Sequence, residues 1–299
     1  MTDASRIAAS EAHAAPGPDP ALPPPLVSPQ WLAQALASPR VCALDASWHL
    51  PTAGRDARAE HLAAHIPGAP FFDIDALSDA SSDLPHMLPD AAAFGRAMGA
   101  LGVSEDMTLV VYDSIGLFSA PRAWWTLRVF GARDVRVLDG GLPAWRAAGL
   151  PLESGTVTRA PTIFHARLDA GAVANMAEVR SALADGSAQV ADARSAERFS
   201  GAAAEPRPGL PAGHMPGARN LPMGLVQAQG RMKAPADVLA AFAQAGLDPD
   251  RPMVTSCGSG VTAAVLNLAL AVAGKPQPRL YDGSWTEWAS RGGAVERDG

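Results

Sequence analysis

The chain has 299 residues, enough for one large domain or two ordinary ones. Hydrophobic residues make up 48% and charged residues 18%, which excludes general disorder, and the net charge of −6 offers no broad attraction to nucleic acid or to an anionic membrane. No apolar run reaches the length of a membrane span, so we expect a soluble protein without a membrane or nucleic-acid partner.

The first 27 residues are rich in alanine and proline and lack the basic start and continuous apolar block of a secretory signal. We therefore expect a disordered leader at 1–27. The two cysteines, Cys42 and Cys257, lie far apart in a chain without an export signal, so reduced thiols in a cytoplasmic protein are expected rather than a disulfide. Cys42 lies in an apolar stretch and is predicted to be a core residue.

Short apolar strands alternate with amphipathic helices along the first half of the chain. The pattern predicts a strand at 108–113, a helix at 120–131, a strand at 135–140 and a helix at 142–149. This alternation is typical of parallel strands with helices on both faces of the sheet. The segment 151–172 has turn residues and no clear period, so it is predicted to be a linker.

The two halves of the chain carry similar stretches in the same order. The offset between matched stretches stays between 143 and 149 residues, which chance rarely produces. The matched pairs are 41–47 with 189–195, 65–69 with 214–218, 109–116 with 253–260, and 138–145 with 281–288. We therefore predict an α/β protein of two similar domains at 28–150 and 173–299, each a mainly parallel sheet flanked by helices on both faces.

In the second half, Cys257 follows a strand predicted at 252–256 and precedes a predicted helix. Gly258 and Gly260 allow positive φ values and let successive backbone N–H groups point inward at the positive end of that helix. Such an anion cradle favours a thiolate, the nucleophilic form of cysteine, and also the anionic outer sulfur of a persulfide. The matching residue of the first half is Asp113, so only the second loop carries a thiol.

From about residue 28 to residue 295, the sequence resembles the tandem-domain rhodanese/sulfurtransferase family. The stretches that carry the resemblance are DASWHLP, GRDAR, HIPGAPFFDID, DLPHMLP, FSAPRAWWTLRVFG, DARSAERF, HMPGARN, SCGSGVTAA and YDGSWTEW. The resemblance implies two rhodanese-like domains, of which only the second is catalytic. It also implies that sulfur is transferred through a persulfide on Cys257.

The loop CGSGVT resembles that of family members that use 3-mercaptopyruvate, whereas thiosulfate-preferring members carry basic residues directly after the cysteine. Thiosulfate is a dianion that benefits from nearby cations, while mercaptopyruvate has one carboxylate that a forked guanidinium can bind. The substrate-binding residues that the resemblance implies are Arg198, Arg207, Gly258, Gly260, Val261 and Thr262. The implied product is pyruvate, and the implied acceptor is cyanide in an assay and a small thiol or thioredoxin-like protein in the cell.

The family also uses a Ser-His-Asp arrangement to handle protons, which implies Ser259 in the cysteine loop together with His65 and Asp56 of the first domain. In this arrangement His65 takes or gives the proton that moves when the substrate is cleaved, and Asp56 orients the imidazole ring. The active site would then lie between the domains. A structural role for His65 stays open, because His214 holds the matching position in the second half.

Three other functions stay open at this point. A thiosulfate sulfurtransferase would use the same cysteine, and a noncatalytic module could carry or sense sulfur for a protein partner. A phosphatase would need an arginine that closes the loop, and the residues after Cys257 do not supply one. The histidines and the two distant cysteines show no metal-ligand spacing, so neither a metal nor a cofactor is expected.

Overall fold

The computed structural model describes residues 25–298, so most of the predicted leader, residues 1–24, lies outside the described residues. The predicted leader ends too late, at residue 27. Leu26 and Val27 form strand β1 (Leu26–Val27), which pairs in parallel with β4 (Asp134–Leu138), and both side chains are buried. The first domain therefore begins before residue 28, because this apolar pair completes the edge of its sheet.

The first domain is a parallel sheet with helices on both faces. Its remaining elements are β2 (Val41–Asp45), β3 (Thr108–Tyr112), α1 (Pro29–Ala35), α2 (Ala57–Ala63), α3 (Ala91–Ala100), α4 (Ala120–Val129), α5 (Gly141–Ala147) and the 3₁₀ turn η1 (Pro51–Ala53). The strand order is β1-β4-β3-β2. Leu109 and Val111 of β3 pack with α3 and α4, whereas Val110 and Tyr112 pack with α1 and α5. This alternation explains why β3 is apolar throughout.

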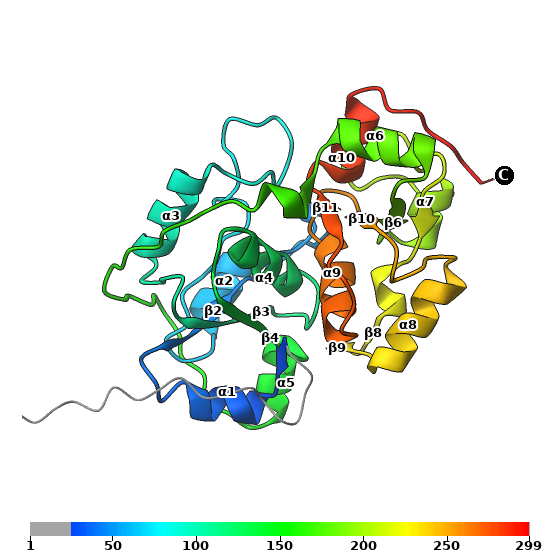
Figure 1. Ribbon diagram of the computed structural model, residues 1–299. Helices are drawn as coiled ribbons and strands as arrows, with labels where there is room; N and C mark the ends of the chain where they lie inside the picture. Colours follow the sequence, from blue (N-terminus) through cyan, green and yellow to red (C-terminus); the bar gives the residue numbers. More distant parts are fainter. Residues whose placement is uncertain (1–24, 299) are drawn as a thin grey trace, which may run out of the picture.

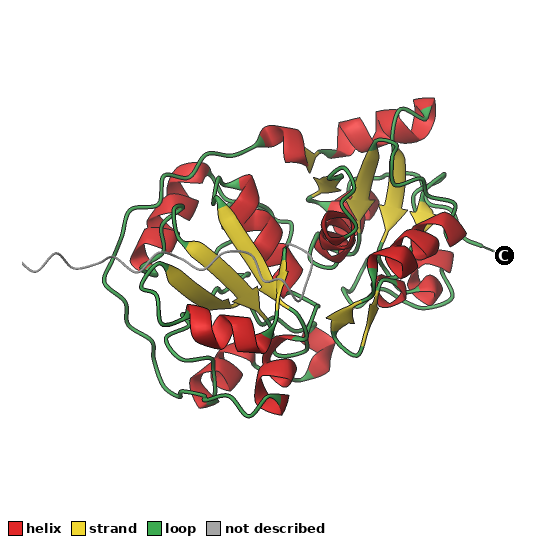
Figure 2. Cartoon of the chain, turned by 60° about the horizontal axis from the view of Figure 1, so that its bottom comes forward, coloured by secondary structure: helices red, strands yellow, loops and turns green. Residues whose placement is uncertain are grey.

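The second domain repeats this plan. Its elements are β5 (Val173–Ala174), β6 (Gln189–Asp192), β7 (Arg219–Asn220), β10 (Met253–Ser256), β11 (Arg279–Tyr281), α6 (Met176–Asp185), α7 (Ala196–Ser200), α8 (Pro235–Gln244), α9 (Ala263–Val272), α10 (Ser284–Ser290), η2 (Ala170–Ala172) and η3 (Met223–Leu225). The strands run parallel in the order β5-β11-β10-β6-β7. Outside this sheet, β8 (Gln227–Ala228) and β9 (Arg231–Met232) form an antiparallel pair. Figure 2 shows helices on both sides of each sheet, and the predicted fold class is confirmed.

Helix α9 lies between the two domains, beside α4 of the first domain (Figure 1). Nearly every residue of α9 is buried, as its apolar sequence predicts. One hydrophobic cluster runs from the first sheet through α4 and α9 into the second domain, and it includes Cys42, which confirms that Cys42 is a core residue. The interface is therefore a continuous core rather than a loose contact between two bodies.

The loops after β6, β10 and β11 lie at the carboxyl edge of the second sheet, which is where parallel α/β sheets bind ligands. Arg194 follows β6, Cys257 follows β10 and Asp282 follows β11. Because α9 begins directly after the cysteine loop and packs on the first domain, this edge faces that domain. Within residues 25–298, no helix is both long enough and apolar enough to cross a bilayer.

Candidate active site

Cys257 lies at a cavity of about 440 Å³ that both domains line. Its residue exposure is only 2%, and Cys257 is among the residues that line this cavity. Trp48, Leu50 and Phe118 of the first domain contribute apolar walls. The cavity beside the cysteine thus lies between the two domains, where the active site was predicted.

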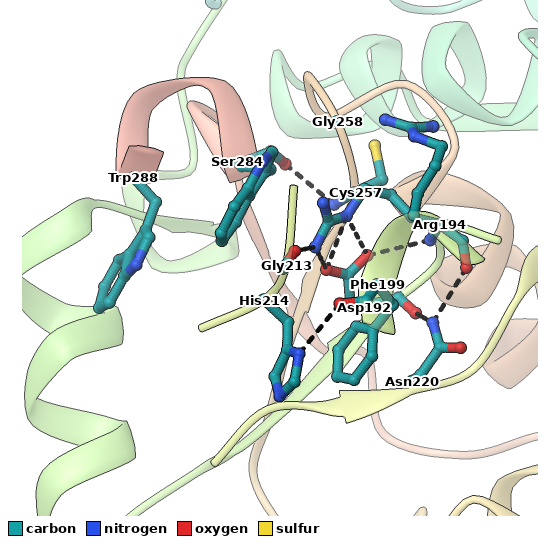
Figure 3. A network of polar contacts seen from close by, with 12 residues as sticks. Asp192, Arg194, Phe199, Gly213, His214, Asn220, Cys257, Gly258, Ser284 and Trp288 are labelled. Carbon is teal, nitrogen blue, oxygen red and sulfur yellow. Dashed lines mark hydrogen bonds and ion pairs between the residues drawn. The ribbon is translucent and has the colours of Figure 1, made fainter. Parts of the chain in front are cut away.

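The start of α10 holds the cysteine loop through hydrogen bonds, although its first residues do not line the cavity. The Ser284 hydroxyl accepts hydrogen bonds from the backbone N–H groups of Cys257 and Gly260, both at 3.1 Å, and donates to the Tyr281 carbonyl at 2.8 Å. Figure 3 shows Ser284 reaching the Cys257 amide. The Trp285 amide also donates to the Cys257 carbonyl at 3.0 Å. The loop is therefore fixed by a serine whose position after the last strand predicts that it lies near the loop, but to which the sequence assigned no role.

The remaining N–H groups of the loop are the ones that can bind an anion. Those of Gly258, Ser259, Val261 and Thr262 have no acceptor among residues 25–298, and all four residues line the cavity. The predicted cradle is therefore present in part, because the amides of Cys257 and Gly260 already donate to Ser284. Four unpaired donors beside one sulfur suit a negatively charged sulfur or substrate atom.

Each loop glycine makes room for an arginine. A Cβ atom on Gly258 would lie 3.0 Å from Nη2 of Arg198, and one on Gly260 would lie 2.7 Å from Nη1 of Arg122. Gly260 also has a φ of 76°, a value that residues with side chains rarely adopt. Sequence reasoning explained the glycines by backbone freedom alone, and the structure adds this close approach of two guanidinium groups.

Arg198 and Arg207 both line the cavity beside Cys257, so the structure brings together the residues predicted to bind the substrate. The buried carboxylate of Glu205 accepts from Arg198 at 2.5 Å and 3.2 Å and thereby fixes its guanidinium. Arg207 has no hydrogen-bonding partner within residues 25–298, so its fork of donors is available. Burial lowers the pKa of Arg207, an effect that the nearby Cys257 opposes by charge attraction.

Arg194 lies among buried partners close to the cysteine loop, and Figure 3 shows it with Asp192 and Gly213. Its guanidinium donates to both oxygens of Asp192, to Glu205 at 2.8 Å and to the Gly213 carbonyl at 2.9 Å, and it stacks 4.4 Å from the centroid of Trp285. Burial opposes the charge, but Asp192 and Glu205 more than compensate and raise the pKa of Arg194. Arg194 therefore has a structural role at the end of β6, where it anchors Glu205.

The predicted partners of Ser259 are wrong. Nδ1 of His65 contacts the His61 carbonyl at 2.7 Å, and its ring stacks on that of His61 inside the first domain. Asp56 caps the start of α2, where its side chain accepts from the Ala59 amide at 3.0 Å. Neither side chain contacts Ser259. The contacts of His65 therefore favour a structural role in the first domain.

His86 and Asp75 occupy the positions that we assigned to His65 and Asp56. Nδ1 of His86 lies 2.9 Å from Oγ of Ser259, and Nε2 lies 2.9 Å from a carboxylate oxygen of Asp75. A carboxylate only accepts, so Nε2 carries a hydrogen. Nδ1 also lies 3.3 Å from the Ser259 carbonyl, so this ring nitrogen faces both oxygens of Ser259. The hydrogen bond from His86 lowers the pKa of Asp75, and the Trp48 indole adds a further hydrogen bond at 3.0 Å.

One signal in the sequence points to His86. The internal repeat gives His65 a histidine counterpart in the second half, whereas His86 lies in none of the four matched pairs of stretches. A residue that only one half carries is a better candidate for chemistry than one that the fold needs twice. His86 also has a positive φ of 61°, a conformation that costs free energy in a residue with a side chain.

The first-domain loop holds an anion of its own. The Asp113 carboxylate accepts from the backbone N–H groups of five residues at 2.6 to 2.9 Å, namely Ile115, Gly116, Phe118, Ser119 and Ala120. The Leu142 amide donates to the Asp113 carbonyl, as the Trp285 amide does to Cys257. The two loops therefore share a backbone design that suits negative charge, and the first is already filled.

Within the described residues there is no group of three or more histidine, cysteine, aspartate or glutamate side chains that could hold a metal ion.

The chain belongs to the rhodanese-like family, because the rhodanese-like domain model matches it twice, at residues 28–148 and 175–291. Among its relatives is the 3-mercaptopyruvate sulfurtransferase of Escherichia coli K12, which is 46% identical over 266 residues, 89% of this chain and 95% of that protein. The human 3-mercaptopyruvate sulfurtransferase is 45% identical over 273 residues, covering 89% of this chain and 92% of that protein. The crystal structure of SseA from Escherichia coli, a 3-mercaptopyruvate sulfotransferase, superposes with a TM-score of 0.81 at 44% identity over 87% of this chain and 98% of that chain.

Proposed function

We propose that this protein is a 3-mercaptopyruvate sulfurtransferase, an enzyme that moves sulfur through a persulfide on Cys257 and releases pyruvate. The observation that carries the proposal is the cavity, in which one buried thiol lies beside four unpaired backbone N–H groups and two guanidinium groups. The similarity to sulfurtransferases of that name over nearly nine tenths of the chain supports the same substrate.

Arg198 and Arg207 bind the carboxylate and carbonyl of the donor in this proposal. A bidentate guanidinium suits a planar carboxylate, and Arg207 has its donors available. Gly258 leaves room for Arg198, and Gly258, Val261 and Thr262 contribute cavity wall and backbone donors. Gly260 acts indirectly in this proposal, because its amide donates to Ser284 and thereby fixes the loop. Fixing the carboxylate end of the donor places its sulfur next to Cys257.

In the first step the Cys257 thiolate attacks the substrate sulfur, and a new S–S bond forms as the C–S bond breaks. The electron pair of the broken bond stays on carbon as the enolate of pyruvate. The proton of the substrate thiol moves through Ser259 and His86 to that carbon, which gives pyruvate and leaves the outer sulfur of the persulfide anionic. Asp75 holds the imidazole ring of His86 in place.

In the second step an acceptor takes the outer sulfur and restores the Cys257 thiolate, so the two steps form a ping-pong cycle. Cyanide serves as acceptor in an assay and gives thiocyanate. A small thiol or a thioredoxin-like protein is the acceptor that we propose in the cell, and the cytoplasm is the compartment that we propose, since both cysteines are free thiols.

The division of labour between the domains is also part of the proposal. Residues 28–150, extended to include β1, form the domain without a catalytic cysteine, residues 151–172 link the two, and residues 173–299 form the catalytic domain. The two matched family segments support this division. The first domain nevertheless supplies His86 and Asp75, so catalysis needs both.

Donor preference tests the proposal. With cyanide as acceptor, kcat/KM should be higher for 3-mercaptopyruvate than for thiosulfate by about tenfold or more, since the residues after Cys257 carry no cation for a dianion. After incubation with mercaptopyruvate alone, intact mass should show one added sulfur that cyanide removes. Cys257→Ser should abolish the adduct and the pyruvate, while Cys42→Ala should keep both.

Two results would overturn the proposal. A preference for thiosulfate would make the protein a thiosulfate sulfurtransferase. The absence of both adduct and pyruvate in the unmodified protein would favour a noncatalytic module that carries or senses sulfur. Arg198→Ala should slow the donor step while leaving a preformed persulfide reactive toward cyanide.

A further inference from the structure

We propose that Arg122 and Asp282 are a pair of positioning residues that hold His86 against Ser259 across the domain interface. The proposal rests on the function proposed above. Arg122 belongs to α4 of the first domain, and Asp282 directly follows β11 of the second. Their side chains are 3% and 4% exposed and form an ion pair at 2.7 Å, although neither residue lines the cavity.

Arg122 connects the backbone of both reacting segments. Its Nη2 donates to the His86 carbonyl at 2.6 Å and to Asp282 at 2.7 Å, and its Nη1 donates to the Gly260 carbonyl at 3.3 Å. Gly260 is the residue after Ser259 in the loop. The guanidinium of Arg122 therefore donates to the backbone of His86 and to that of Gly260, the residue next to Ser259.

Asp282 completes the connection from the other side. Its second carboxylate oxygen accepts from the Leu88 amide at 2.7 Å, two residues beyond His86. The segment that carries His86 is thus bonded at its carbonyl by Arg122 and at the Leu88 amide by Asp282. Because the pair is buried, these charge-assisted bonds are strong and scarcely screened by salt.

The local backbone shows why such a connection is needed. His86 has a φ of 61°, so its conformation costs free energy unless surrounding contacts impose it. The segment has no regular secondary structure of its own to impose it. Gly260 lies so close to Arg122 that a Cβ atom at this position would be 2.7 Å from the guanidinium. Both observations are explained if Arg122 sets the distance between His86 and Ser259.

The consequence is a specific kinetic effect. Loss of the connection lets His86 move away from Ser259 but leaves Arg198 and Arg207 in place, because neither is hydrogen-bonded to Arg122 or Asp282. Proton transfer should slow while donor binding stays the same, because a displacement of about 1 Å at a reacting group can cost about a hundredfold in rate.

The test uses single-turnover release of pyruvate from mercaptopyruvate by the full-length protein, which reports the rate constant, the half-saturating donor concentration and the amplitude. Arg122→Met and Asp282→Asn should each lower the rate constant by about tenfold to a hundredfold. The half-saturating concentration should change by less than about threefold, and the amplitude should stay near one pyruvate per chain. Arg122→Lys should restore part of the rate.

Arg128→Met is the matched control. Arg128 lies on the same helix and stacks 4.8 Å from Trp124, as Arg122 does from Trp125, but it is on the surface and far from the loop. This variant should keep the unmodified rate. A purely structural role of Arg122 would instead lower the amplitude and the melting temperature and leave the rate constant of the folded fraction unchanged, which would overturn the proposal.

A double-mutant cycle with Ser259→Ala gives the second test. If Arg122 acts through the contact between His86 and Ser259, Arg122→Met should have little further effect on the rate once Ser259 is gone. Additive effects would overturn the proposal. If Arg122→Met does not fold, the same cycle with Asp282→Asn decides the question. Failure of the unmodified protein to release pyruvate would instead contradict the proposed function, so the two failures are distinguishable.

Discussion

The two cysteines show how strongly the reactivity of a thiol depends on the groups around its sulfur. Cys42 lies in the core of the first domain, where burial raises the pKa of its thiol to about 11, an effect that the charge of Arg159 only partly opposes. Its S–H group donates to the Ala43 carbonyl at 3.3 Å. Cys257 is equally buried from bulk solvent but faces a cavity with unpaired N–H groups. One thiol is therefore inert and the other is placed for chemistry.

The Cys42 thiol should make the protein less stable in alkali. Its raised pKa means that the folded chain keeps a proton that the unfolded chain releases near pH 9, so its contribution is fully present below that pH and is lost as the pH rises toward 11. Over this range the free energy of unfolding should fall by about 2 to 3 kcal/mol more in the unmodified protein than in Cys42→Ala. Urea unfolding of both proteins at several pH values measures the difference, and parallel curves would contradict the prediction.

At the scale of elements, local sequence patterns predicted regular structure well. The helix predicted at 120–131 is α4, and the strand predicted at 108–113 is β3, because an apolar run or an apolar stripe depends only on neighbouring residues. The cysteine loop was predicted for the same reason. The partner of Ser259 was not, since His86 lies 173 residues away in an irregular segment and meets it only across the domain interface. Topology predicts Ser284 near the cysteine loop, but not the role of its hydroxyl, because that hydroxyl acts on a loop 27 residues earlier.

Ser284→Ala should test the control that α10 exerts over the cysteine loop. Removal of the hydroxyl leaves the buried N–H groups of Cys257 and Gly260 without their acceptor, which should lower the free energy of unfolding by about 1 to 3 kcal/mol and slow persulfide formation. Urea unfolding and single-turnover pyruvate release measure the two effects.

Two further variants separate the hydroxyl from the backbone at this position. Ser284 has a φ of 49°, so Ser284→Gly relieves the backbone but also lacks the hydroxyl, and it should be more stable than Ser284→Ala yet equally slow. Ser290→Ala, at the far end of the same helix, should change neither quantity by much. A rapid Ser284→Gly variant would show that the hydroxyl does not shape the loop.

At the scale of the whole molecule, the two domains share one core. The cluster that begins in the first sheet continues through α4 and α9 into the second domain, and the buried pair of Arg122 and Asp282 crosses the same interface. Separate domains with small polar interfaces tend to move and unfold independently. A continuous apolar interface with a buried ion pair favours joint unfolding, and it also explains how a residue of one domain can be held at hydrogen-bonding distance from the catalytic loop of the other.

Thermal unfolding should therefore be a single transition. Calorimetry should give one peak whose calorimetric and van't Hoff enthalpies agree, because neither domain can keep its core when the other is lost. Leu268→Ala, in the buried part of α9, should lower the free energy of unfolding by about 2 to 5 kcal/mol and move the whole peak to lower temperature. Two separated peaks, of which only one moves, would contradict the prediction.

The Asp113 carboxylate has a consequence for how sulfur would be counted in this protein. The amides of the first loop already bind the Asp113 carboxylate, so they are not available to a transferred sulfur atom. Of the two similar loops, only the second can therefore hold a persulfide. A donor with radiolabelled sulfur would then transfer one labelled sulfur atom per polypeptide at saturation. The bound radioactivity would therefore count the protein molecules directly.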